Sequence, residues 1–226
     1  MKRIFLLFLA LCFVSLYSDQ VDFNSKPMTA GKSSLAENGY LVTRLLDTVN
    51  FSPEIRLPIQ LIYNSASEKT GMFGYAWNSP QLESSAKYDK DGVLWVTPWG
   101  EKIKFYPKKE KLPKDAVKIP LYEEAKKGQG FYAPYSEWEA DTSSRDYRRS
   151  GEWVFTGKNN KAGWRFTYSG SRPHKITAPS GRTIEYVYVG KKLTALRQNN
   201  LDFVTFEYTG NQVSSLTING VKYELF

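Results

Sequence analysis

A motif of twenty residues recurs three times near the C-terminal end of the chain. Aromatic residues and glycines return at the same places in each copy: Phe166, Tyr186 and Phe206; Tyr168, Tyr188 and Tyr208; Gly170, Gly190 and Gly210. Each copy contains a short alternating apolar stretch, a glycine turn and a second apolar stretch. A repeat this short cannot bury its own hydrophobic face, so the copies must stack on one another. We therefore expect β-structure that grows by the addition of hairpins, rather than a compact enzyme built around a pocket.

The first 18 residues have the pattern of a secretory signal peptide. Lys2 and Arg3 form a positive start. Ile4–Leu16 is a run of 13 residues, apolar except for Ser15, and is too short for a comfortable membrane span. Cleavage is expected after Ser18, which predicts export to the periplasm, the cell surface or the medium. An uncleaved N-terminal anchor is the alternative. We expect no membrane span in the mature chain.

Composition indicates how the mature chain is stabilised and which partners it is not expected to bind. The only cysteine, Cys12, lies inside the signal, so the mature chain would hold no disulfide and would depend on a hydrophobic core. Without the signal, 29 basic and 23 acidic residues leave a net charge of +6. The charges alternate with apolar residues, as in Lys102–Phe105, which is typical of a solvated strand face. We therefore expect no binding to nucleic acid.

Extended patterns dominate the rest of the chain. Alternation and turn signals predict strands at Gly39–Val49, Ile55–Tyr63, Leu82–Tyr88, Val93–Val96, Glu101–Tyr106 and from Trp153. Pro58 cannot donate to a ladder, which predicts an edge or irregular pairing there. No segment has a helical stripe with caps, so the fold class is all-β. The expected divisions are a signal (1–18), an extended lead-in (19–38), an N-terminal β region (39–106), a charged insertion with an aromatic-rich connector (107–150), and the repeats (151–226).

Two blocks of sequence resemble the Rhs/YD-repeat family. Leu57–Ser65, with its Tyr-Asn-Ser ending, followed by Gly71–Trp77, resembles the N-terminal region of such proteins, although Ala76 stands where the family often has glycine. The stretch Pro179–Tyr188 resembles the start of a YD repeat, although Val189 stands in place of the Asp of that repeat. The resemblance covers roughly residues 39–226.

The resemblance implies an antiparallel β-hairpin ribbon that coils into a shell wall. In longer relatives, the shell encloses a toxic domain and often carries an Asp-Pro cleavage site. This sequence contains no Asp-Pro pair and about three degenerate repeats. We therefore expect an open rather than a closed shell, without toxin cargo.

Few residues offer catalytic chemistry. His174, the only histidine, is expected in a turn between strands, and nothing beside it in the sequence forms a triad or a zinc site. Glu137 and Glu139 flank Trp138 and could act as a pair of carboxylates in glycoside hydrolysis, but the same pattern suits a half-buried strand. We predict no catalytic, metal or cofactor site and no enzyme activity.

Aromatic residues give the remaining candidates for binding. Trp99 in a predicted turn, Trp77 in the family-like block and Trp138 could stack on sugars. The main hypothesis is an exported structural or interaction module, and the alternatives are a carbohydrate- or cell-wall-binding β module and a carboxylate-pair glycoside hydrolase. An open ribbon leaves unpaired backbone groups along its last strand, Val221–Phe226. We expect that edge to pair with a protein partner or a second copy of the chain.

Overall fold

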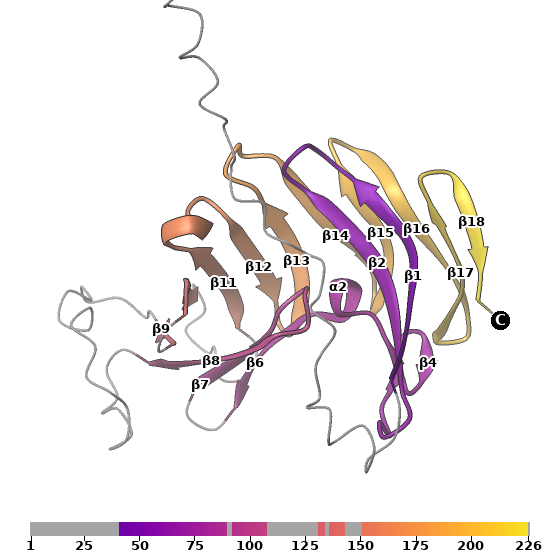
Figure 1. The fold of residues 1–226 in the computed structure, drawn as a ribbon, viewed down its shortest axis with the longest axis horizontal. Coiled ribbons are helices and arrows are strands. Elements are labelled where there is room, and N and C mark those ends of the chain that lie inside the picture. The colour runs from indigo at the N-terminus through magenta and orange to yellow at the C-terminus, as the bar shows by residue number, and fades with distance from the viewer. Residues whose placement is uncertain (1–40, 90–91, 108–130, 134–135, 143–150, 226) are drawn as a thin grey trace, which may run out of the picture.

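The computed structural model of the protein describes residues 41–89, 92–107, 131–133, 136–142 and 151–225. Nearly all of its regular secondary structure is antiparallel strand, which confirms the all-β fold class (Figure 1). The predicted signal (1–18), the lead-in (19–38) and most of the charged insertion lie outside the described residues.

The strands are β1 (Leu41–Asn50), β2 (Arg56–Asn64), β3 (Thr70–Gly71), β4 (Gly74–Tyr75), β5 (Trp77–Asn78), β6 (Ser85–Asp89), β7 (Gly92–Val96), β8 (Lys102–Pro107), β9 (Phe131–Tyr132), β10 (Trp138–Thr142), β11 (Glu152–Gly157), β12 (Arg165–Ser169), β13 (Arg172–Thr177), β14 (Thr183–Val189), β15 (Lys192–Gln198), β16 (Leu201–Thr209), β17 (Gln212–Ile218) and β18 (Val221–Glu224). Two single-turn helices, α2 (Pro80–Glu83) and the 3-10 helix η2 (Asn159–Lys161), interrupt them.

One large sheet forms the body of the molecule. Its 13 strands follow chain order from β6 to β18, and each pairs antiparallel with the next. The sheet curls strongly but is not closed into a barrel (Figure 1). At its first strand, the Ala86 amide donates to the Ser171 carbonyl in the β12–β13 turn at 3.3 Å, so β6 returns toward the middle of the same sheet. The predicted open hairpin ribbon is therefore confirmed.

The twenty-residue period sets the register of the ribbon. Gly170, Gly190 and Gly210 start two-residue turns and have φ of 59°, 61° and 61°, the left-handed conformation that favours glycine. Each of these hairpins has a bulge two residues into the strand after the turn, at Lys175/Pro173, Ala195/Leu193 and Ser215/Val213. Because turn and bulge recur together, equivalent side chains of the three copies point in the same direction.

The inner face of the sheet carries the repeated apolar residues. Ladders of side chains run across the strands and are almost fully buried: Trp164, Ile184 and Val204; Phe166, Tyr186 and Phe206; Ile176, Leu196 and Leu216. Alternate residues face solvent, as a sheet with one covered face requires.

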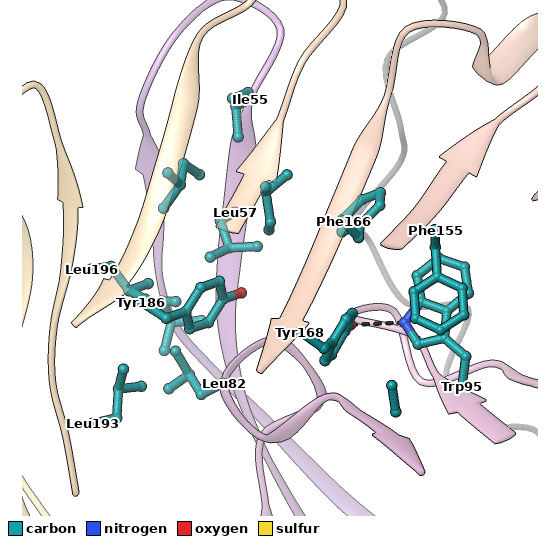
Figure 2. Close-up of a cluster of buried hydrophobic side chains, with 14 of the residues drawn as sticks. Ile55, Leu57, Leu82, Trp95, Phe155, Phe166, Tyr168, Tyr186, Leu193 and Leu196 are labelled. Carbon is teal, nitrogen blue, oxygen red and sulfur yellow. Dashed lines mark hydrogen bonds between the residues drawn. The ribbon is translucent and has the colours of Figure 1, made fainter. Parts of the chain in front are cut away.

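A second layer covers this inner face. The β1–β2 hairpin, joined by β5, lies across β14–β17, with α2 beside it (Figure 1). Ile55 and Leu57 point into the same cluster as Tyr186 and Leu196 (Figure 2), and both are fully buried. The core therefore lies between two parts of the chain that are more than 100 residues apart.

Two local predictions for the N-terminal region are refined by the structure. Pro58 pairs with Thr48 of β1 on one side, while β5 reaches only Ile62 and Tyr63, so Pro58 lies where β2 has a single neighbour. The strand predicted over Leu82–Tyr88 was wrong at its start, because α2 occupies 80–83 and β6 begins at Ser85. Pro80 suits the first turn of a helix, where its missing amide costs nothing.

Candidate functional site

An aromatic cluster fills the part of the sheet between β6 and β12. Its centre is Trp95 of β7, which is fully buried and stacks on Phe155 of β11 with ring centroids 4.2 Å apart and planes 5° from parallel. Trp138 and Trp99 approach it edge-on at 5.3 and 5.5 Å. These contacts make the region a packed core.

Buried tyrosine hydroxyls join this core to α2 and its flank. The Trp95 indole Nε1 donates to the Tyr168 hydroxyl at 2.7 Å (Figure 2). That hydroxyl donates to Ser84 Oγ at 3.2 Å. The Tyr186 hydroxyl donates to the Gln81 carbonyl at 2.8 Å. Burial raises the pKa of both tyrosines, so both hydroxyls stay protonated. The repeats therefore hold the segment from 81 to 84 in a fixed position.

The family-like block contains a turn held by the partly buried carboxylate of Glu83. Glu83 Oε1 accepts the Met72 amide at 3.0 Å and Oε2 accepts the Ser79 amide at 2.9 Å. A Cβ at Gly71 would overlap Glu83 Oε1, so a side chain at this position would displace the carboxylate from the two amides that it binds. Ala76, which stands where the family often has glycine, has φ of 63°. Burial raises the pKa of Glu83, while the two amide hydrogen bonds lower it to a smaller extent.

The three predicted binding indoles lie in or against packed clusters. Trp138 is only 4% exposed, and Trp99 is partly buried rather than exposed, with its Nε1 donating to Glu101 Oε2 at 3.0 Å. Trp77 is also partly buried, and its ring centroid lies 5.2 Å from that of Tyr63. Packing accounts for these positions, and a sugar-binding role for the three indoles stays a prediction.

His174 lies within a strand, so the prediction that it occupies a turn was wrong. The tight turn at Gly170 lets β13 begin at Arg172, and the bulge leaves His174 as the extra, exposed residue of that strand. A sequence pattern reveals the apolar alternation but not the bulge that shifts it.

The two candidate carboxylates do not share a strand face. Glu139 lies on the exposed face of β10 and pairs with Lys158 at 3.7 Å, whereas Glu137 precedes the strand. The Glu137 carbonyl accepts the Lys158 amide at 2.7 Å. In the part of the chain that the structure describes, no cluster of His, Cys, Asp or Glu is arranged to hold a metal ion, and no helix is long and apolar enough to cross a bilayer.

The turn end of the repeats contains a periodic arrangement that sequence reasoning missed. The Arg172 guanidinium lies 5.5 Å from the centre of the Tyr188 ring and donates to the Gly190 carbonyl at 3.0 Å. One repeat later, Lys192 Nζ lies 5.1 Å from the centre of the Tyr208 ring and donates to the Gly210 carbonyl at 2.6 Å. A cation two residues after Gly170 and after Gly190, in register with the aromatic ladder, was the available signal; Gln212 occupies this place after Gly210.

Two hollows flank this turn end. The larger, of about 950 Å³, lies between β6 and the strands β13–β15, and its lining includes Lys87, Tyr88, His174 and Glu185. The smaller, of about 370 Å³, lies between the segment Leu82–Ser85 and the turns of the last repeats. Glu185 of the larger hollow pairs with Lys175 at 2.9 Å, and this contact lowers the pKa of Glu185.

The last described strand leaves one side of the sheet open. β18 pairs with β17 through four residues, and no other described strand lies beyond it. Lys222 Nζ lies 2.9 Å from Glu207 Oε2 and 3.1 Å from Glu224 Oε1, so this strand carries charged side chains. Val221 is 53% exposed. Charged residues on an edge strand are a common protection against uncontrolled pairing.

Comparison with known proteins identifies one family. Residues 36–105 match a family described as a domain of unknown function (DUF6531). The match spans β1–β8 and contains both the Tyr-Asn-Ser segment and the turn held by Glu83. No curated protein matches the chain.

Proposed function

We propose that the chain is an exported, non-enzymatic structural and interaction module of the Rhs/YD-repeat type, which acts through the shape and edges of its sheet. The observation that carries this proposal is the uninterrupted 13-stranded ribbon, in which glycine turn, bulge and apolar ladders recur with the twenty-residue period. A wall of this kind can be extended by one hairpin at a time.

The N-terminal region supports the same proposal. The domain matched at residues 36–105 is commonly found in Rhs/YD-repeat proteins. The glycine-like conformation of Ala76, at a position where the family often has glycine, is what a shared backbone would require. The close approach of Glu83 to Gly71 explains why glycine occupies the first position of the block.

The open edge of β18 is the proposed interaction surface. In the last hairpin, Ile218 pairs with Val221 and Leu216 pairs with Tyr223. Because backbone amides alternate in direction along a strand, those of Lys222 and Glu224 point outward, away from β17. A strand from a second copy of the chain could pair with these groups by β-addition. Its contribution would come mainly from main-chain hydrogen bonds.

The oligomeric state tests this mode of action. Lys222→Pro removes an outward amide at a position that tolerates an edge-strand proline. Lys222→Thr is the matched control, because it removes the same charge but keeps the amide and favours a strand. Light scattering during gel filtration should show self-association of the wild type and the control, and a monomer for Lys222→Pro. A wild type that stays monomeric at high concentration would contradict the proposed edge.

Export has a separate test. Expression of the full chain in a secreting bacterial host, followed by mass spectrometry of the intact protein, should detect a product that starts at Asp19 outside the cytoplasm. A cytoplasmic product that retains Met1 would exclude the export part of the proposal.

A further inference from the structure

The two hollows at the turn end adjoin, and together they make up one depression. They share Ser171, Arg172, Pro173 and Tyr188, so the Arg172–Tyr188 stack lies between them. The depression runs from β6 past the β12–β13 turn to the turns of the later repeats. We call it the turn-end track.

Two lysines and a histidine with spare bonding capacity line this track. Lys87 and His174 are exposed in the larger hollow, and Lys191 is exposed in the smaller one. None of their three side chains has a hydrogen bond or an ion pair with a residue that the structure describes. Of the two carboxylates in the lining, Glu185 is paired with Lys175, and Glu83 is held by backbone amides. The charge left for a ligand is therefore positive.

Tyrosine rings alternate with these cations. Tyr88 lies in the larger hollow with Lys87, Tyr188 lies at the junction beside Arg172, and Tyr208 lies in the smaller hollow under Lys192. The three rings are partly buried, so each is held in place by packing. A ligand that suits this lining carries negative charges along its length and presents flat C–H surfaces between them.

We propose that the turn-end track binds a carboxylate-bearing oligosaccharide, such as a chain of uronic acid residues. Its carboxylates pair with the lysines, and its apolar ring faces contact the exposed parts of the tyrosine rings. A depression that is open along its length suits a chain rather than a compact molecule. An acidic peptide supplies similar charges, but it lacks a stack of regular ring faces.

The test compares three oligomers of equal length on the purified protein by isothermal titration calorimetry. The probes are a hexamer of galacturonic acid, a neutral hexamer of glucose and hexaglutamate. The galacturonate hexamer should bind, with an affinity that falls as salt is added. The neutral hexamer and hexaglutamate should bind at least about tenfold more weakly, a difference of about 1.4 kcal/mol.

Variants locate the binding to the track. Removal of one exposed charge weakens such a contact by up to about fivefold. The double variant Lys87→Gln/Lys191→Gln should therefore bind the galacturonate hexamer about tenfold more weakly than the wild type. Lys161→Gln is the control: this lysine lies in η2, is partly exposed and lines neither hollow. Both variants keep the packed residues, and equal thermal melting temperatures will verify their folding.

Three results would overturn the proposal: no binding of the galacturonate hexamer, equal binding of hexaglutamate, or the same loss in the control as in the double variant. Equal binding of hexaglutamate would assign the track to acidic peptides instead. None of these results bears on the edge of β18, because the track and that edge share no residue.

Discussion

Tyr168 and Tyr208 occupy the same place in two copies of the repeat but have different surroundings. The Tyr168 hydroxyl is buried, accepts the Trp95 indole N–H at 2.7 Å and donates to Ser84 Oγ at 3.2 Å. The Tyr208 hydroxyl donates to the Leu193 carbonyl at 2.8 Å from a partly buried site. Substitution by phenylalanine removes one oxygen in both cases and leaves the ring in place.

The expected losses of stability follow from what each hydroxyl leaves behind. Tyr168→Phe strands the Trp95 N–H in a core without water, and a buried donor without an acceptor costs about 1–3 kcal/mol. Ser84 loses its partner as well, so we expect a loss of about 2–3 kcal/mol in the free energy of unfolding. Water can replace the Tyr208 contact, so Tyr208→Phe should cost about 0.5–1 kcal/mol.

Urea unfolding measures both losses, with far-UV circular dichroism and tryptophan fluorescence as probes. The dependence of the free energy on urea should stay unchanged, so that the shift in midpoint reports stability alone. Once Tyr168→Phe is present, Ser84→Ala should cost little more, because the two residues act as one network. Equal losses for the two tyrosine variants, or a Tyr168 loss under about 0.5 kcal/mol, would refute this reasoning.

Two further predictions concern the turns and pH. Gly190→Ala should lower the free energy of unfolding by about 1 kcal/mol through its positive φ alone, since no atom lies within 4 Å of the added Cβ. Gly190→Asn should cost less stability, because Asn199 and Asn219 already adopt φ of 50° and 51° in neighbouring turns. Thermal melting compares the two variants with the wild type. An unchanged melting temperature for Gly190→Ala would contradict the argument. The raised pKa of Glu83 means that the folded protein holds a proton which the unfolded chain loses above about pH 4.5, so the contribution of this residue to stability should fall as pH rises through the folded-state pKa. The urea midpoint of the wild type should therefore fall relative to that of Glu83→Gln as pH rises through this range. A difference in midpoint that stays constant with pH would contradict the prediction.

Local patterns predicted most of the strands because their causes are local. The alternation of Ile55–Tyr63 identified β2, and the glycines at the repeat turns identified the hairpins of β12–β17, since burial with a period of two and a left-handed turn depend on near neighbours. The failures arose where tertiary contacts decide. Trp99 was expected on the surface because its segment reads as a turn, yet its ring packs on Trp95 and Phe166.

Other failures came from single-residue irregularities. The bulge that places His174 in β13 leaves no mark in the hydrophobic pattern, because the same residues read equally well as a turn. The helix α2 is one turn long, too short for a helical stripe. Hydrogen bonds from the Tyr186 hydroxyl to the Gln81 carbonyl and from the Met72 amide to Glu83 join it to the rest of the fold. Residue spacing predicts neither feature.

The amino-acid sequence by itself determined that this chain forms stacked antiparallel hairpins, because period and turn chemistry act within about twenty residues. Only the tertiary structure decided what those hairpins enclose and expose. Tyr186 meets Gln81 across 105 residues, and Asn219 meets Asp47 across 172. The turn-end track likewise unites Lys87 of β6 with the turns of the repeats. Such pairings depend on how far the sheet curls. Every strand contributes to the curl, so no single segment of the sequence specifies it.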